Sequence, residues 1–171
     1  MDDRTVTIIL RLIHILAGVF WAGTAFLMAG FLVPTMRATG KEGGVFIQHL
    51  MRERRLHAVL GIAMLLTVLS GIAMYAKLAA ATHGAWAHTA PGIAYSVGAV
   101  AAIVGGIVGA VYGGSAGRRI AAIGARIGAA GPSAEQQAEM RRLQARIRNG
   151  TRLAAVCLAV AAGAMAVARY L

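Results

Sequence analysis

Four long apolar stretches constrain this chain more than any other feature of its sequence. They cover residues 12–33, 56–76, 92–112 and 153–171. A helix needs about 20 apolar residues to cross the hydrocarbon core of a bilayer, and each stretch meets or approaches that length. None of them shows the period-two alternation of a transmembrane strand. We therefore predict an all-α fold, a four-transmembrane-helix bundle that forms one integral membrane domain over residues 1–171.

The composition agrees with lipid as the solvent. Only 13% of the residues are charged and 58% are hydrophobic, whereas an average soluble domain carries about 25% charged residues. The net charge of +11 lies mostly in the connections beside the apolar stretches. We therefore expect it to set the topology and attract anionic lipids rather than bind nucleic acid. The first stretch is too long for a cleavable signal peptide, which predicts a retained helix.

The basic residues also predict the orientation of the helices. Thirteen of the seventeen lie in the connections after the first and third stretches. These are Arg37, Lys41, Arg52, Arg54, Arg55, Arg118, Arg119, Arg126, Arg141, Arg142, Arg146, Arg148 and Arg152. The other four are Arg4, Arg11, Lys77 and Arg169. Because Lys and Arg concentrate in cytoplasmic loops, both termini are expected on the outer face of a bacterial inner membrane.

The third connection has the pattern of a helical hairpin over about residues 116–152. Isoleucines at 120, 123 and 127 mark one helical stripe, and Met140, Leu143 and Ile147 mark another. Between the stripes, Gly131-Pro132-Ser133 breaks the helix, and Ser133 with Gln136 has the form of a capping box. We predict a cytoplasmic hairpin that continues the third and fourth spans, with an Arg-rich surface facing solvent or lipid.

The third span carries two stripes of small residues. One comprises Gly105, Gly109, Gly113 and Gly117, and the other comprises Gly98, Ala102, Gly106, Ala110 and Gly114. Small residues at this spacing let helix backbones approach closely in lipid. We expect tight packing inside the bundle, with Gly109→Leu strongly destabilising. The alternative is a homo-oligomer or a larger membrane complex assembled through this face.

The candidate chemistry lies on one face of the first helix. This face contains Arg11, His14, Gly18, Trp21, Ala25 and Met28, at the spacing of helical neighbours. The four spans contain no Asp or Glu, which argues against a carboxylate proton relay. His14 is therefore the main candidate, since polar residues in a span normally face the bundle interior.

Other polar and aromatic residues are predicted at the same outer end. They are Met74, Tyr75, Lys77, Tyr95, Arg169 and Tyr170, with His83, Trp86 and His88 in the outer loop. Imidazole and thioether groups are suitable ligands for haem iron or copper. Arg and Tyr can hold haem propionates or a quinone carbonyl. The alternative is an ordinary membrane interface, where aromatic and basic residues are enriched in any case.

Two further histidines, His49 and His57, are predicted at the opposite, cytoplasmic end, too far away to share a metal with His14. His57 follows Arg52, Arg54 and Arg55. We expect that basic cluster to anchor anionic headgroups. Cys157, the one cysteine, lies in an apolar run and is expected to be a small buried hydrophobe.

These residues carry a family resemblance over about the first 75 residues. His14-x6-Trp21-Ala22-Gly23, with Pro34 closing the span, resembles the first helix of CopD-type copper-resistance membrane proteins and of the related HemJ-type family. Arg52-x-Arg54-Arg55-Leu56-His57 and the later Ser70-Gly71 are similar to the same superfamily. The chain departs from it at Thr24-Ala25, which lacks the second Gly of the copper family, and at Pro34-Thr35-Met36, which does not match the HemJ pattern.

The resemblance implies a metal or haem ligand at His14, with Trp21 as a packing neighbour. HemJ-type proteins bind haem b and oxidise protoporphyrinogen, and CopD-type proteins are linked to copper uptake. Our first expectation is a redox-active haem b protein with its site near the outer leaflet, made by Arg11, His14, Trp21, Tyr75, Tyr95 and Arg169. The second is copper handling through His14, Met74, His83 and His88. The third is a non-catalytic accessory subunit of a larger membrane complex.

Overall fold

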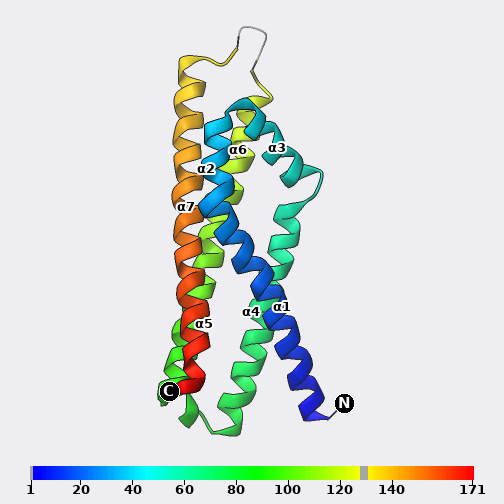
Figure 1. Cartoon of the computed structure of the whole chain (residues 1–171), viewed down its shortest axis with the longest axis vertical. Coiled ribbons are helices and arrows are strands. Elements are labelled where there is room, and N and C mark those ends of the chain that lie inside the picture. Colours follow the sequence, from blue (N-terminus) through cyan, green and yellow to red (C-terminus); the bar gives the residue numbers. More distant parts are fainter. Residues whose placement is uncertain (1, 128–130) are drawn as a thin grey trace.

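The computed structural model describes residues 2–127 and 131–171. Four long helical rods run side by side, over Asp3–Thr39, Leu56–Ala81, Ala90–Gly124 and Ala134–Tyr170, and no strand occurs in these ranges (Figure 1). All four rods are long and apolar enough to cross a membrane. The two termini lie at the same end of the molecule (Figure 1). The all-helical prediction with four spans is therefore confirmed, with helices that extend past the predicted spans.

Large apolar side chains are exposed on every one of these rods. Leu16, Leu69, Val100 and Val156 are 69%, 61%, 62% and 59% exposed, respectively. A soluble monomer rarely leaves so much contiguous apolar surface in contact with water. The surface is consistent with a multi-pass membrane protein whose outer face contacts lipid.

The first rod bends at a widened turn instead of ending at proline. It consists of α1 (Asp3–Leu27), the π-helical η1 (Met28–Leu32) and α2 (Val33–Thr39). Pro34 has no N–H and its ring crowds the preceding turn, which explains a wide turn immediately before it. The helix does not end at Pro34 but continues until Gly40, whose φ is +59°.

The connection to the second rod contains a helix that the sequence analysis did not predict. Here α3 (Lys41–Arg52) follows Gly40, and a short turn leads into α4 (Leu56–Ala81). The turn ends at Arg55, which adopts the left-handed conformation with φ +51°. The basic connection is thus an ordered helix and a tight turn.

The second half of the chain forms a long helical pair. A 3-10 turn, η2 (Ala85–His88), leads from α4 into α5 (Ala90–Val108), which continues through the π-helical η3 (Gly109–Gly114) into α6 (Ser115–Gly124). The return helix α7 (Ala134–Val167) ends in η4 (Ala168–Tyr170). Ser133 and Gln136 cap α7 reciprocally, which confirms the predicted capping box.

The hairpin itself is present as α6 packed along the first part of α7. Leu143 is buried between them, and Arg119 pairs with Glu139 at 3.3 Å across the two helices. The predicted tip of the hairpin includes residues 128–130, which lie outside the described residues. In Figure 1 the start of α7 extends beyond the ends of α2 and α3.

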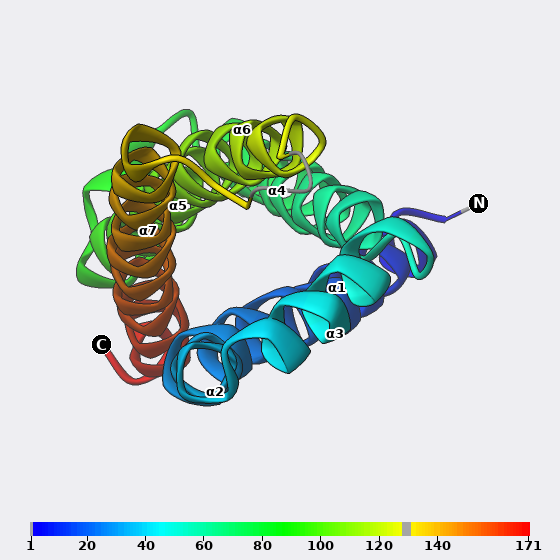
Figure 2. The same ribbon diagram turned by 90° about the horizontal axis from the view of Figure 1, so that it is seen from above.

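The core lies where all four rods meet. Trp21 of α1 is 8% exposed and packs in one cluster with Ala63 of α4, Ala102 of α5, and Leu158 and Ala161 of α7. Elsewhere α1 pairs mainly with α4, and α5 mainly with α7, as both views show (Figure 2). The Trp21 side chain therefore joins the two helix pairs.

The glycine stripes of the third rod are packed over only part of their length. A Cβ placed on Gly105 would lie 3.1 Å from the Cys157 Cβ, and one on Gly98 would lie 2.9 Å from the Met165 Cγ. In contrast, a Cβ on Gly113 or Gly117 would meet no atom within 4 Å. The prediction of tight packing is confirmed for the half of the rod that lies in α5 and is wrong for the half that lies in η3 and α6.

Candidate functional site

The centre of the candidate site is His14, on the face of α1 that packs against α4. Its Nδ1 atom lies 2.8 Å from the Thr67 carbonyl oxygen and 3.4 Å from the Ser70 Oγ. A carbonyl oxygen accepts hydrogen bonds and never donates them, so Nδ1 carries the proton. Ser70 donates its own proton within α4, to the Leu66 carbonyl oxygen, and can accept from His14. The contact therefore fixes the tautomer of a neutral His14 ring.

Small residues make room for the His14 ring between the two helices. A Cβ placed on Gly71 would lie 2.9 Å from the His14 Cε1 and 3.1 Å from its Nδ1. One turn further along α1, a Cβ on Gly18 would lie 3.4 Å from the Thr67 Cγ2. Glycine at both places lets the backbones approach closely, which brings a helix carbonyl within reach of the imidazole.

The tautomer leaves one ring nitrogen of His14 with a lone pair. When Nδ1 holds the proton, Nε2 of the neutral imidazole is an acceptor and a metal ligand. The hydrogen bonds that His14 makes with described residues use Nδ1 alone. Histidines that bind metals commonly donate their other ring N–H to a carbonyl or carboxylate, which orients the ring. His14 has this arrangement, with Thr67 as the acceptor.

Sequence reasoning did not assign a role to Thr67. The signal for it was present, because Thr67, Ser70 and Gly71 interrupt an otherwise apolar span. Thr67 and Ser70 are both buried, at 7% and 5% exposure. What the sequence did not give was the rotation of α4 that turns these residues toward His14.

Trp21 lies in the core of the bundle. Its indole lies among the residues where the four rods meet, and a Cβ on Gly106 would lie 3.3 Å from its Cζ2. Trp21 is therefore a core residue, and its expected role beside a haem or copper ligand stays a prediction. Arg11, on the same stripe, is exposed.

The predicted tyrosines form a separate aromatic cluster with Trp86. The Trp86 ring lies 5.2 Å from that of Tyr75 and 5.8 Å from that of Tyr95. The Tyr75 hydroxyl donates to Ser96 Oγ at 2.8 Å, since Ser96 itself donates to the Gly92 carbonyl. These contacts join α4, η2 and α5 at the end where both termini lie. They connect the tyrosines with each other rather than with His14.

The remaining candidate ligands are spread over the same end of the molecule. Met74 is half-buried on α4, whereas His83 and His88 are exposed in the connection from α4 to α5. Arg169 is exposed, with its guanidinium 4.8 Å from the ring centre of Tyr170. Within residues 2–127 and 131–171, no three His, Cys, Asp or Glu side chains are grouped to hold a metal ion.

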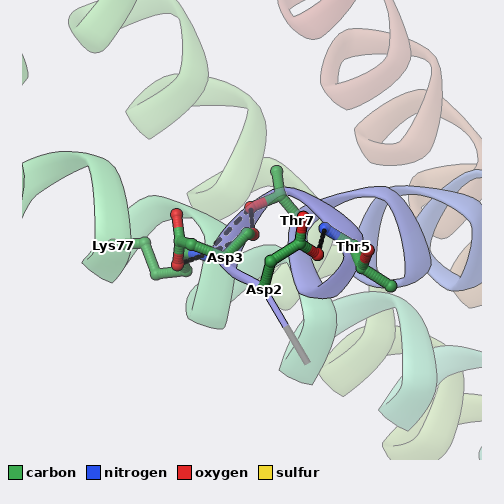
Figure 3. Close-up of polar contacts among 5 residues, drawn as sticks. All are labelled: Asp2, Asp3, Thr5, Thr7 and Lys77. Carbon is green, nitrogen blue, oxygen red and sulfur yellow. Dashed lines mark hydrogen bonds and ion pairs between the residues drawn. The ribbon is translucent and has the colours of Figure 1, made fainter.

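Lys77 links α4 to the first residues of α1. Its Nζ lies 2.6 Å from Asp3 Oδ1 and 2.9 Å from Thr7 Oγ1 (Figure 3). The neighbouring Asp2 caps α1, and its hydrogen bonds from the Thr5 side chain and backbone hold the pKa of its carboxyl below the ordinary value of 3.8. Lys77 is thus engaged with the start of α1 and is not a free cation beside His14.

The chain matches no protein-family model, no curated protein and no solved structure.

Proposed function

We propose that this chain is a small integral membrane protein that binds haem b through Nε2 of His14 and takes part in electron transfer. The observation that carries the proposal is the hydrogen bond from His14 Nδ1 to the Thr67 carbonyl oxygen. That bond leaves the other nitrogen as a ligand on a ring held in one orientation.

The residues around His14 suit a haem in several respects. Imidazole is a common axial ligand of haem iron, and the apolar helices suit the mostly apolar macrocycle. When bound, haem would supply one-electron chemistry, and the chain would hold and orient it. Arg11 and Arg169 are exposed cations toward the end of the bundle where the termini lie, and we assign them to the propionates.

His14 is the one axial ligand that we assign. Lys77, which a sequence argument would also consider, is held by Asp3 and Thr7. Copper is the other metal that an imidazole and a thioether would bind, with Met74 as the second ligand. The experiment below therefore measures both metals.

The proposed orientation follows from the basic residues. The hairpin of α6 and α7 and the α3 segment would lie in the cytoplasm, and both termini would lie outside the inner membrane. His14 would then sit toward the outer leaflet.

The test compares His14→Asn with His14→Ala after expression with excess haem and copper. The amide nitrogen of Asn occupies nearly the position of Nδ1, so it can still donate to Thr67, but Asn offers nothing in place of Nε2. We expect the purified wild type to show a near-stoichiometric Soret band that shifts on reduction, or stoichiometric copper. The His14→Asn variant should lose most of the metal while keeping the thermal stability of the wild type, whereas His14→Ala should lose both.

The matched control is His57→Asn. His57 also has its Nδ1 bonded to a backbone carbonyl, that of Met51 at 2.9 Å, but it lies at the opposite end of the bundle. This variant should keep its pigment. A colourless, metal-free wild type after gentle extraction, or a His14→Asn variant that keeps full occupancy, would overturn the proposal. The accessory-subunit interpretation would then replace it.

A further inference from the structure

The helix α3 lies between two rods that are long enough to cross a membrane. It begins directly after α2 and ends three residues before the start of α4. A Cβ placed on Gly43 would lie 2.7 Å from the Met36 Cα, so α3 folds back closely against α2. Figure 1 shows α3 sloping from the end of α2 toward the start of α4, and from above it spans the distance between them (Figure 2). Its place in the chain therefore puts it beside the ends of two rods that are long and apolar enough to cross a membrane.

The apolar side of α3 is only partly covered by protein. Phe46, Ile47 and Leu50 share one helical face, and Ile47 and Leu50 are half-buried while Phe46 is 54% exposed. The opposite face carries Lys41, Gln48 and Arg52, all exposed. An apolar face beside a basic one is typical of helices that lie in the plane of a membrane interface.

The charge of this segment also favours a negative partner. Five basic side chains surround α3, and all of them are exposed: Arg37, Lys41, Arg52, Arg54 and Arg55. The segment contains two acidic residues, Glu42 and Glu53. The ion pairs found among the described residues, Lys77 with Asp3 and Arg119 with Glu139, involve none of these side chains.

We propose that α3 and the Arg52–Arg55 turn form a lipid-binding surface that lies in the headgroup layer of the leaflet and recruits anionic phospholipids. Phe46 enters the boundary between headgroups and acyl chains, and the basic side chains bind lipid phosphates. This surface is distinct from His14, which lies on α1 against the middle of α4, and it does not depend on whether haem binds.

The first experiment measures the depth of α3 in the bilayer. Single cysteines at Phe46→Cys and Gln48→Cys, in a Cys157→Ala background, are labelled with an environment-sensitive fluorophore and reconstituted into vesicles of phosphatidylglycerol and phosphatidylcholine. Position 46 should be quenched by nitroxide lipids and shielded from aqueous iodide. Position 48, on the opposite face, should show the reverse. Equal iodide access at both positions would overturn the proposal.

The second experiment measures lipid selection in the otherwise intact protein. Arg52→Gln combined with Arg54→Gln is compared with Arg141→Gln combined with Arg142→Gln, which removes the same charge from the hairpin. Each basic residue at an anionic surface strengthens binding about fivefold, so the first pair should weaken phosphatidylglycerol binding about 25-fold. The measurement is the phosphatidylglycerol fraction in lipid that is retained with the extracted protein.

The hairpin pair should retain the wild-type lipid fraction, because it leaves the basic side chains of α3 and the Arg52–Arg55 turn in place. Equal loss in both pairs would mean a general effect of net charge and would overturn the assignment to α3. Unchanged retention in the Arg52 and Arg54 pair would also overturn it. If that pair fails to fold, the depth measurement, made with all the arginines present, still decides.

Discussion

At the scale of single residues, side-chain size sets how closely the helices approach. Gly71 leaves room for the His14 ring, and Gly105 lets α7 pack closely against α5. A Cβ on Gly105 would lie 3.3 Å from the Ala154 carbonyl oxygen. Backbone atoms cannot move aside as a flexible side chain can. Gly109 is less critical than its place in the stripe suggests, because its nearest neighbour would be the Ala154 Cβ at 3.9 Å.

Gly105→Leu should destabilise the bundle far more than Gly113→Leu. The two glycines belong to the same stripe, but a Cβ on Gly113 meets nothing within 4 Å. Forcing a large side chain into a packed contact costs roughly 1–3 kcal/mol. Thermal unfolding in detergent should show a lower midpoint for the first variant and a near wild-type midpoint for the second. Equal midpoints would mean that α5 and α7 do not pack through Gly105.

The carboxylate of Asp2 should make the start of α1 sensitive to acid. Its pKa is lowered in the folded state by hydrogen bonds from Thr5, so its stabilising effect is present above the ordinary value of 3.8 and is lost as the pH falls through the lower, folded value. Hydrogen exchange at the Thr5 amide, corrected for its intrinsic rate, should rise in that acidic range. Asp2→Asn keeps a capping side chain and should remove the pH dependence. A dependence that survives this substitution would assign it to another group.

At the scale of elements, the helices are continued or stopped by identifiable backbone chemistry. The rod from Asp3 to Thr39 passes Pro34 through a π-helical turn, and the third rod contains a second π-helical segment, η3, within a glycine-rich stretch. Beside η3, a Cβ on Gly150 would collide with the Tyr112 ring, over which the Arg146 guanidinium lies at 5.0 Å. Glycine is needed at position 150 because the Tyr112 side chain of η3 lies directly against the α7 backbone there.

Ser133→Ala should loosen the first turn of α7. The Ser133 Oγ accepts a hydrogen bond from the Gln136 backbone N–H at 3.2 Å, and the Gln136 Oε1 accepts one from the Ser133 backbone N–H at 2.9 Å. Removing an N-cap side chain costs about 1 kcal/mol, so exchange of the amides in this turn should rise about fivefold. Ser115→Ala, a serine inside the α6 rod that bonds back to Val111, should leave these amides unchanged. Unchanged exchange in the Ser133 variant would mean that this cap does not stabilise the start of α7.

At the scale of the whole molecule, two helix pairs meet around Trp21. The α1–α4 pair carries His14 and the Lys77–Asp3 contact, and the α5–α7 pair carries the hairpin. Both termini lie at one end, and α3 and the start of α7, which belong to the two basic connections, lie toward the other (Figure 1). An unequal distribution of Lys and Arg between the two ends determines how multi-pass membrane proteins are oriented.

A reporter fused after Leu171 should be active only if it functions outside the cytoplasm. The thirteen-to-four distribution of basic residues favours that orientation. The matched fusion, inserted after Gly131 at the hairpin, should show the opposite preference. An active cytoplasmic reporter after Leu171 would reverse the topology and place His14 toward the inner leaflet.

The sequence by itself determined the features that depend on local composition. Four apolar stretches of sufficient length must become helices in lipid, because a helix satisfies its own backbone hydrogen bonds. The cap at Ser133 was equally predictable, since Ser133 and Gln136 lie three positions apart, and so were the helical stripes on either side of it. The α3 helix is harder to predict, because it has only 12 residues, with a short apolar pattern and basic residues at its ends.

Only the tertiary structure decided which residues meet. His14 and Thr67 lie 53 positions apart, and their contact depends on where α1 and α4 cross and how each is rotated. The same holds for the aromatic cluster, in which Tyr75 and Tyr95 both pack against Trp86. It also holds for the glycine stripes, of which one half is packed and the other open. Crossing points are set jointly by the side-chain volumes of all four rods, so no single helix's sequence contains them.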